Sequence, residues 1–508
     1  MRTFYHIVQT RHKTSINIRG FTSCVSHQKR FDPVLLVISG AIFSLLILMA
    51  YLVFSVISMI AIGLGAAVVI YQIVTLQGKL ASKFKYGKRF PSAFFIFLIV
   101  APIVLGITVG YDTYSTQNSI ARAILLWGLT LTFWSTLLFI PLALYSKHRE
   151  MSIPPITSFP RISVIVPAYN EEKVIERTVQ ALIDTKYPDK EIILVDDGSK
   201  DKTFDLMNKY KKQAKVLQKT NGGKASAINF GLAYATGEII VIVDADTIIG
   251  HESLVYLAEG FSIDKNVAAV AGNIKVRNRK NWLTWCQAIE YVGGIQIARR
   301  AMDVFGAISV VPGALGAFRK SVLDEIGSYH KDTLVEDFDV TLKILKTKLV
   351  ISGSTNSTAY TEAPESLRNL YRQRKRWYGG NLQVFSRHSD ALTNPRFGIL
   401  QRLVFPYMIF SSCVMPFVSI ITTISAIYAA IFGGGIFVLE MFAIFSTLQC
   451  LQVALAVRLD NEDPKLIFYG IFLVIGFKQI LDMLLISAIF EHLLKRDAVW
   501  TSSERIGI

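Results

Sequence analysis

The sequence predicts an α/β domain inserted between two regions of membrane-spanning helices. Of its 508 residues, 52% are hydrophobic and the mean hydropathy is +0.41, more apolar than an ordinary soluble protein. Between residues 151 and 394, short apolar runs alternate with charged helical stretches, the pattern of a parallel sheet covered by helices. The basic residues behind the formal charge of +16 flank the apolar runs, so we expect membrane lipids as partners and no nucleic acid.

The N-terminal part begins with a basic arm, residues 1–33, whose first 31 residues hold six Lys and Arg and no acid. A targeting peptide is the alternative, but no short apolar segment with a small-residue cleavage site follows. The uncharged run 34–76 is about twice the ~20 residues that cross a bilayer, so we expect it to pass twice. The next loop, 79–89, has five Lys and Arg and no acid, which places it and the N-terminus in the cytoplasm.

Two further spans are expected at 91–110 and 123–145, joined by an outside loop, 111–119, with one charge, Asp112. About four helices in residues 34–145 then place the polar domain, 146–394, in the cytoplasm. We expect about three more helices in 395–491, two of them from 403–457, broken by Gly433-Gly434-Gly435 and Glu440. A short tail, 492–508, follows. The whole is a multi-pass protein of the plasma membrane.

The last apolar segment, 466–490, contains Lys478 and Asp482, four residues apart on one helical face. Ionisable groups at membrane depth are candidates for lining a polar path. The alternatives are that the two side chains satisfy each other, or that this helix lies at the interface.

Three predicted strands of the polar domain end in polar residues. The run 161–167 ends at Pro167-Ala168-Tyr169-Asn170-Glu171, with Asn170 as the cap of a helix to about 186. The run 191–195 ends in Asp196-Asp197-Gly198-Ser199, and 238–243 ends in Asp244-Ala245-Asp246. The carboxyl ends of parallel strands meet at one edge, where ligands of open α/β sheets bind. Taken singly, Asp-Asp-Gly-Ser is also an ordinary turn.

Asp244 and Asp246 suit a hard divalent cation. Mg²⁺ or Mn²⁺ held by one or two carboxylates takes its other ligands from water and substrate phosphates, so we expect a phosphorylated partner. The stretch 220–224 precedes a helical pattern, 225–235, and its glycines let backbone amides approach an anion, while Lys224 supplies a charge for a diphosphate. Its spacing is not that of a P-loop, and a surface turn is the alternative.

Three later stretches carry further candidates. The small residues of 309–319 suit either a cleft wall or a Gly-rich strand. Glu336 and Asp337 stand at the start of a helical pattern, where acids also occur as capping charges. The basic stretch 365–377 fits a helix lying on anionic headgroups, but Trp377 can also stack on a pyranose ring, and Arg376 can hold a diphosphate.

The motifs Asp-Asp-Gly-Ser, Asp-Ala-Asp, Glu-Asp-Phe-Asp and Gln-Arg-Lys-Arg-Trp follow one another in one domain between membrane segments. This set resembles membrane-embedded family-2 glycosyltransferases, which include the poly-N-acetylglucosamine, hyaluronan, chitin and cellulose synthases. The stretch 221–225 and Gly379-Gly380 look most like the poly-N-acetylglucosamine branch. The resemblance implies a GT-A (Rossmann-like) α/β fold, a UDP-sugar donor, Mg²⁺ or Mn²⁺, and inversion at the anomeric carbon.

The resemblance also implies roles for single residues. In the nucleotide-sugar site we expect Pro167, Tyr169, Glu171, Asp196, Asp197, Lys224 and Asp244. Asp244 and Asp246 match the metal-binding pair, and Asp337 matches the catalytic base. At the acceptor and diphosphate we expect Glu336, Gln373, Arg376 and Trp377.

We therefore predict an inverting glycosyltransferase that transfers a sugar, N-acetylglucosamine being the best match, to a growing polysaccharide and passes the product through its own membrane helices. One alternative is the transfer of a single sugar to a polyprenyl phosphate or glycolipid, and another is a non-enzymatic scaffold or transporter. The sequence departs from the family in its four N-terminal spans, where near relatives usually have two. Fewer than twenty residues follow 489, too few for the cyclic-dinucleotide-binding domain of bacterial cellulose synthases.

Overall fold

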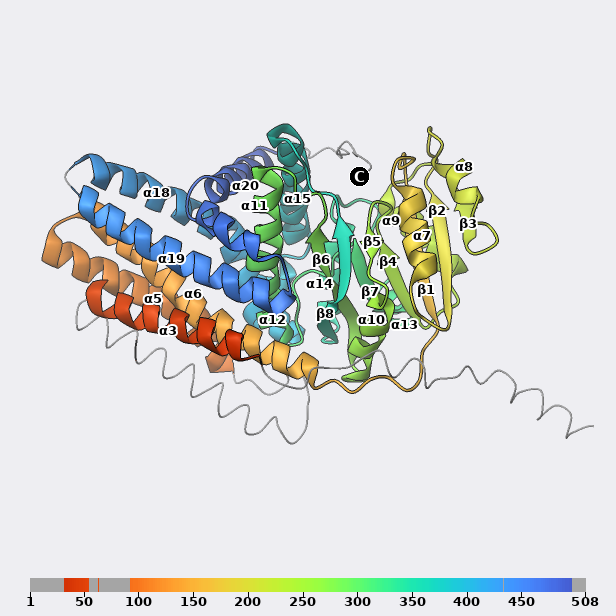
Figure 1. Cartoon of the computed structure of the whole chain (residues 1–508), viewed down its shortest axis with the longest axis horizontal. Helices are drawn as coiled ribbons and strands as arrows, with labels where there is room; N and C mark the ends of the chain where they lie inside the picture. Colours follow the sequence, from red (N-terminus) through yellow and green to blue (C-terminus); the bar gives the residue numbers. More distant parts are fainter. Residues whose placement is uncertain (1–31, 54–62, 64–91, 433, 496–508) are drawn as a thin grey trace, which may run out of the picture.

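The computed structural model describes residues 32–53, 63, 92–432 and 434–495, in which a helical bundle and a sheet domain lie end to end. Figure 1 shows the bundle of α3, α5, α6, α18 and α19 on one side and the sheet on the other. Helices α11 (Trp282–Ile289), α12 (Ile297–Asp303) and α15 (Leu367–Arg387) stand between them. The predicted organisation of an α/β domain flanked by long apolar helices is therefore seen.

Within the described residues, four helices are long and apolar enough to cross a membrane: Pro33–Tyr51, Ile120–Met151, Leu400–Ile431 and Gly435–Asp460. A pair of helices bent by 55°, Pro464–Leu473 and Phe477–Leu493, would make a fifth if counted as one span. The second passage expected within 34–76 lies outside the described residues, as does the basic loop 79–89.

Two boundaries in the N-terminal half differ from the prediction. Helix α5 (Ser92–Gln117) continues through most of the expected loop, because residues 111–117 contain neither glycine nor proline, and it ends before Asn118, whose φ is +47°. Helix α6 (Ile120–Met151) begins at once, capped by Ser119, whose hydroxyl accepts a hydrogen bond from the amide of Arg122. It also runs past 145, so its last turn belongs to the contact with the sheet domain.

The C-terminal helices also correct the prediction. The first span consists of η4 (Leu400–Val404), α17 (Phe405–Ile409), η5 (Phe410–Val414) and α18 (Met415–Ile431). Glu440 does not interrupt the helix, contrary to the prediction. It is an exposed residue with good helix propensity inside α19 (Gly435–Asp460). The last segment is not one helix: η6 (Pro464–Leu473) and α20 (Phe477–Leu493) meet at Gly476, which has φ +94°. In α20, Lys478 and Asp482 pair with each other.

The described residues contain an eight-stranded sheet with the order β3-β2-β1-β4-β7-β6-β8-β5. The strands are β1 (Ile162–Ala168), β2 (Lys190–Asp196), β3 (Lys215–Gln218), β4 (Ile239–Val243), β5 (Ile248–Ile249), β6 (Val267–Val276), β7 (Leu315–Arg319) and β8 (Val350–Thr361). The first four are parallel, as predicted, but β7 runs antiparallel to β4 and β6. The expected parallel sheet is therefore a mixed one.

Alternate side chains of the central strands enter two apolar cores, one on each face of the sheet. Ile165, Ile193 and Ile240 belong to one core, and their neighbours Val164, Ile192 and Val241 belong to the other. Flanking helices cover both faces: α7 (Ile175–Asp184), α8 (Thr203–Asn208), α9 (Lys224–Tyr234), α10 (Ser253–Ser262), α13 (Lys320–Glu325) and α14 (Glu336–Lys346). This double coverage explains why these strands read as continuous apolar runs.

The predicted cap at Asn170 is wrong. Helix α7 begins only at Ile175, after Val174, which makes no side-chain cap. Asn170 instead adopts φ +56°, and its side-chain oxygen accepts a hydrogen bond of 2.8 Å from the amide of Lys200. Asparagine tolerates the left-handed conformation better than other residues with a side chain, so it serves a turn here.

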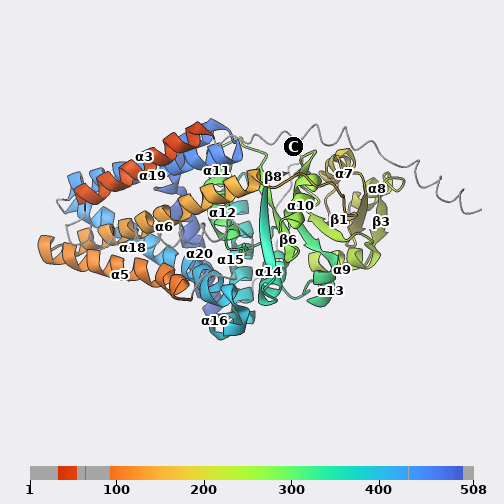
Figure 2. The same ribbon diagram turned by 90° about the horizontal axis from the view of Figure 1, so that it is seen from below.

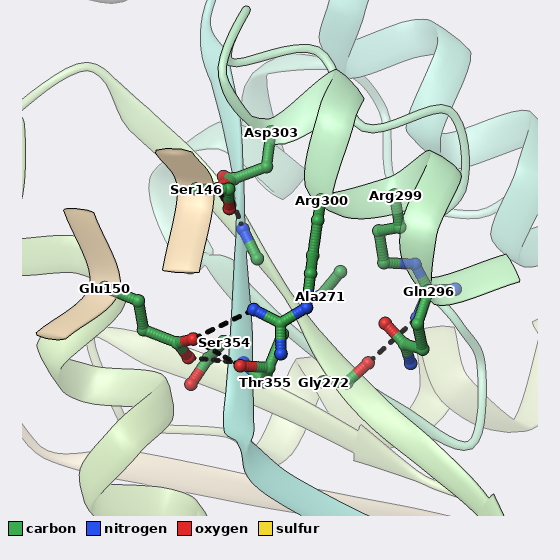
Figure 3. A pocket seen from close by; sticks show the side chains of 11 residues that line it. Ser146, Glu150, Ala271, Gly272, Gln296, Arg299, Arg300, Asp303, Ser354 and Thr355 are labelled. Carbon is green, nitrogen blue, oxygen red and sulfur yellow. Dashed lines mark hydrogen bonds and ion pairs between the residues drawn. The ribbon is translucent and has the colours of Figure 1, made fainter. Parts of the chain in front are cut away.

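Buried ion pairs join the bundle to the sheet domain (Figure 3). Arg300 of α12 contacts Glu150 of α6 at 3.3 Å and Asp460 at the end of α19 at 2.6 Å. Arg149 pairs with Asp303, the last residue of α12. Removing one partner of such a buried pair costs about 3–5 kcal/mol, because the other charge is left buried without compensation, so we expect these contacts to fix how the helices meet.

Candidate active site

The carboxyl ends of β2, β1 and β4 meet at one edge of the sheet, as the sequence predicts. Ala168 at the end of β1 lies opposite Asp196 at the end of β2, and Ile165 lies opposite Ile242 of β4. The amide of Asp197 donates a 2.8 Å hydrogen bond to the carbonyl of Ala168. The turns that leave the three strands therefore form one continuous rim.

The side chains of Asp196 and Asp197 are both buried and bind loops of the protein itself. Asp196 accepts a hydrogen bond of 3.2 Å from the amide of Ser199 in its own turn. Asp197 accepts bonds from Lys219, at 2.6 Å, and from the amide of Gly223, at 2.8 Å. The glycine amides predicted to receive an external anion thus hold a carboxylate of the chain, which fixes the loop before α9.

The turn after β1 borders the same rim. Pro167 is buried in β1 and Tyr169 is half-buried. The amide of Glu171 donates a 2.8 Å hydrogen bond to the hydroxyl of Thr203 at the start of α8. These three residues therefore lie beside Asp196 and Asp197, where the resemblance places the nucleoside.

Lys224 connects residues that the sequence assigns to different parts of the site. Its Nζ lies 2.5 Å from Asp244 Oδ1 and 2.9 Å from Glu336 Oε1. Burial lowers the pKa of Lys224, but the charges of Asp244 and Glu336 outweigh burial and raise the pKa above its ordinary value. The lysine therefore stays charged and joins Asp244, one member of the expected metal pair, to Glu336, which is expected at the acceptor.

Asp337 is held by two backbone amides at the start of α14. Its Oδ2 accepts a bond of 3.0 Å from Gly313, and its Oδ1 accepts one of 2.8 Å from Phe338. Burial, followed by the charge of Glu336, raises the pKa of Asp337 to about 6, although Lys224 and the two amides act in the opposite direction. A carboxyl group with this pKa can take up a proton near neutral pH.

Gly313 lies where any side chain would collide with this cluster. A Cβ atom added there would lie 2.8 Å from Lys224 Nζ and 3.5 Å from Asp337 Oδ2. The segment 309–319 divides at this point, because its second part forms β7 (Leu315–Arg319). The strand interpretation is therefore confirmed for Leu315–Arg319, and the cleft wall stays a prediction for the residues before it.

The oxygen ligands at the end of β4 fit a divalent cation bound together with a nucleotide. Asp246 is 4% exposed and accepts a 3.3 Å hydrogen bond from Thr247. In the part of the chain that the structure describes, no group of three His, Cys, Asp or Glu side chains could hold a metal alone. Two carboxylates that depend on substrate phosphates for the remaining ligands are the usual arrangement for Mg²⁺.

Helix α15 packs against the segment that carries the acids. A Cβ atom on Gly380 would lie 2.9 Å from Val335 Cγ1, so the helix and the residue before Glu336 come as close as a glycine allows. Trp377 lies three residues earlier on the same helical face. Gln373 Oε1 is buried without a hydrogen-bond partner among the described residues. The basic helix therefore belongs to the domain and adjoins Glu336 and Asp337.

Sequence reasoning missed the support beneath Trp377. The guanidinium carbon of Arg374 lies 4.3 Å from the centre of the Trp377 ring, and Arg374 also pairs with Glu290 at 2.7 Å. Burial raises the pKa of Tyr291 to about 12. The charge of Arg374 acts in the opposite direction, and the charges of Glu290 and Asp246 add to the effect of burial. The spacing of three residues signals the Arg374–Trp377 contact, but nothing in the sequence points to η2 (Glu290–Gln296).

Comparison with known proteins decides the family of this domain. Residues 163–327 match the family model described as Glycosyl transferase family 2. The chain carries a family 2 glycosyltransferase domain. The matched part includes β1, β2, β4 and β7, so the mixed sheet described above is the expected GT-A-like fold.

Two bacterial relatives extend the similarity beyond this domain. The chain is 27% identical to a poly-beta-1,6-N-acetyl-D-glucosamine synthase of Staphylococcus epidermidis over 363 residues, 68% of this chain and 88% of the relative. It is 32% identical to the enzyme of the same name from Staphylococcus aureus over 246 residues, 48% of this chain and 60% of the relative. Among solved structures, a mannosyltransferase from Pyrobaculum calidifontis in complex with GDP-Man and Mn²⁺ is 21% identical, with a TM-score of 0.49 over 74% of this chain and all of that one.

Proposed function

We propose that this protein transfers N-acetylglucosamine from UDP-N-acetylglucosamine to a growing polysaccharide, with inversion at the anomeric carbon. The observation that carries the proposal is the convergence of Asp244, Lys224, Glu336 and Asp337 at the rim of a family 2 domain. The names of the staphylococcal relatives support the choice of sugar. The raised pKa of Asp337, about 6, also supports a catalytic role over a scaffold, because perturbed carboxyl groups cluster at active sites.

In the proposed reaction, Asp337 is the general base. An acceptor hydroxyl is a weak nucleophile at neutral pH, so the Asp337 carboxylate takes its proton while the oxygen attacks C1 of the donor sugar. The new C1–O bond forms on the face opposite the nucleotide, and the bond from C1 to the phosphate oxygen breaks, leaving UDP. General-base catalysis of this kind contributes about 10²- to 10⁴-fold to the rate.

Negative charge develops on the departing diphosphate. In the proposed site a metal ion, Arg376 and Lys224 would offset it. Asp244 and Asp246 would hold Mg²⁺ or Mn²⁺, which supplies a Lewis acid for the phosphate oxygens. Lys224 of α9, which contacts Asp244, and Arg376 of α15 are the protein's own cations proposed to face the diphosphate, and the amide oxygen of Gln373 has no hydrogen-bond partner among the described residues. Asp196, Asp197, Pro167, Tyr169 and Glu171 form the proposed nucleoside side of the site.

Trp377 is the proposed platform for the acceptor sugar. Arg374 stacks against one face of its ring and is anchored by Glu290, so the indole is held in a fixed plane. Apolar faces of pyranose rings stack on such surfaces. Glu336, held by Lys224, lies beside Asp337 and would orient the acceptor hydroxyl.

The proposed location is the plasma membrane, with the catalytic domain in the cytoplasm, where UDP-sugars are available. The four candidate spans support membrane insertion, and the basic loop 79–89 supports the orientation. The product would pass through the bundle beside α20. Lys478 and Asp482, which pair with each other, therefore add no free charge to such a path.

A screen of UDP-sugars with the full chain in detergent tests the proposal by two readouts, release of UDP and the size of the product. We expect UDP-N-acetylglucosamine to give the fastest release, which depends on Mg²⁺ or Mn²⁺ and is lost in Asp246→Asn and Asp337→Asn. A ladder or polymer supports repeated addition, whereas one lipid-soluble product assigns the enzyme to single transfer to a polyprenyl phosphate or glycolipid. Absence of UDP release with every donor would leave only the scaffold or transporter alternative.

A further inference from the structure

An aromatic groove lies between η6 and α11, outside the site described above. Its volume is about 330 Å³, and it is lined by Trp285, Lys465, Phe468, Tyr469 and Phe472. Trp285 and Tyr469 stack with ring centres 5.3 Å apart and planes 6° apart. Phe468 is 82% exposed, so its ring is open to whatever surrounds the groove.

The groove lies at the end of the bundle that meets the sheet domain. Asp460, the last residue of α19, is bound there by Arg300 at 2.6 Å and, through its carbonyl, by Lys275 of β6 at 2.9 Å. From this end η6 runs back along α19, as the closeness of Gly470 to Cys450 shows. A Cβ atom on Gly470 would lie 3.4 Å from Cys450. Cys450 is ten residues before Asp460, so η6 reaches about 15 Å back along the span.

This geometry sets the depth of each lining residue. At about 2.0 Å per residue of 3₁₀-helix, Lys465 lies about 5 Å from the end of the span and Phe468 about 11 Å from it. Aromatic residues gather in this zone of a bilayer, and interfacial helices bury their apolar faces about 5–10 Å into it. Lys465 is thus at the level of headgroup phosphates and Phe468 at the level of the first acyl carbons, whereas Phe472, four residues further along η6, lies about 8 Å deeper along the acyl chain.

One ammonium group, that of Lys465, lines the mouth of the groove. Lys465 is exposed and has no ion pair among the described residues. Of the acids near it, Glu462 binds Arg279 at 2.8 Å and Lys275 at 3.1 Å, whereas Asp463 accepts the backbone amide of Lys465 at 2.9 Å and keeps its charge. An anionic headgroup therefore finds a free ammonium group here, whereas a zwitterionic one gains less.

We propose that this groove binds one anionic diacyl phospholipid, with its phosphate on Lys465 and an acyl chain against Phe468, Phe472 and the stacked pair of Trp285 and Tyr469. The proposal uses the membrane placement suggested above and is independent of the transferase reaction. A lipid seated here contacts both η6 and α11, and the end of α11 continues into η2, which carries Glu290. The occupant would therefore brace the helix that supports Arg374 and Trp377.

Native mass spectrometry of the full chain, released from nanodiscs of equal phosphatidylglycerol and phosphatidylcholine with identical acyl chains, tests the proposal. We expect the protein to retain phosphatidylglycerol in preference to phosphatidylcholine. Lys465→Gln should reduce that preference about fivefold, the effect of about one basic residue at an anionic surface, and Lys465→Arg should keep it. Phe468→Ser should lower retention of both lipids alike.

Lys212→Gln is the matched control, because Lys212 is an exposed lysine between α8 and β3, at the far end of the sheet domain (Figure 1). Binding of UDP by each variant reports whether it is folded. The proposal fails if Lys465→Gln keeps the full preference, if neither lipid is retained, or if the retained molecule has the mass of a polyprenyl phosphate. Because no step of the measurement needs turnover, an inactive enzyme and an empty groove give different results.

Discussion

The pH dependence of sugar transfer is the most direct measure of the assignment of Asp337. Burial and the neighbouring charge of Glu336 raise its pKa from the ordinary 3.8 to about 6. A general base works only when deprotonated, so activity should fall as the pH drops through about 6. At pH 5 a carboxyl group with a pKa of 6 is about 9% deprotonated and one with a pKa of 3.8 about 94%, a tenfold difference in rate.

The assay is UDP release from UDP-N-acetylglucosamine, measured as kcat/KM from pH 4.5 to 9. UDP affinity is measured over the same range to separate binding from catalysis. Glu336→Gln removes the like charge beside Asp337, so the acid limb should move to lower pH even though the rate falls. A kcat/KM at pH 5 within twofold of its value at pH 8 would refute the assignment. So would a residual activity of Asp337→Asn that still falls at the same acid pH as the wild type.

The same pKa makes a prediction about stability. Because the folded pKa of Asp337 lies above the unfolded one, its contribution is fully present below about pH 4 and is lost as the pH rises through about 6. At pH 8 the buried charge costs roughly 3 kcal/mol, at about 1.36 kcal/mol per pH unit. Asp337→Asn avoids this cost but weakens one of the hydrogen bonds from Gly313 and Phe338, worth about 1 kcal/mol, so the variant should melt higher than wild type at pH 8 and not at pH 4.

Three further variants test the supports of the site. Gly380→Ala places a methyl group 2.9 Å from Val335 Cγ1, so we expect about 1–3 kcal/mol of destabilisation in thermal melting and lower turnover; unchanged melting would show that α15 can move. Arg374→Met leaves the partly buried Glu290 without its partner and should lower the free energy of unfolding by about 3–5 kcal/mol. The double variant with Glu290→Gln should recover part of this loss in thermal melting, and no recovery would argue against the pair. Lys224→Met removes the cation nearest the proposed base, so the acid limb of kcat/KM should move to higher pH, and a shift to lower pH would contradict the assignment.

The sequence predicted the strands and their polar ends because both depend on local pattern. Buried central strands appear as apolar runs, and a chain leaving such a strand places its next side chains at the sheet edge. Asp196, Asp244 and Asp246 could therefore be assigned to one rim. The antiparallel β7 could not, because its direction depends on pairing with β4, about 75 residues earlier, which no local pattern encodes.

The errors at the site have the same origin. The helix start at 224 predicts an anion near Lys224, but where the lysine points is decided by Asp244 and by Glu336, more than a hundred residues later. The glycine amides of 222–223 also hold an anion, as the pattern predicts, and only the fold shows that it is Asp197. The local pattern thus indicates that these groups meet an anion, and the fold shows which carboxylates of the chain they contact.

Helix α15 contacts both the sheet domain and the helical bundle. On one side its Gly380 touches Val335, next to Glu336 and Asp337, and on the other its Lys375 pairs with Glu491 of α20 at 3.0 Å. Figure 2 shows α15 between α14 and α20. We therefore expect a displacement of α20 to reach Val335 and the acids after it through α15. An acceptor held on Trp377, as proposed, would lie on the one helix that adjoins both the acids and the bundle.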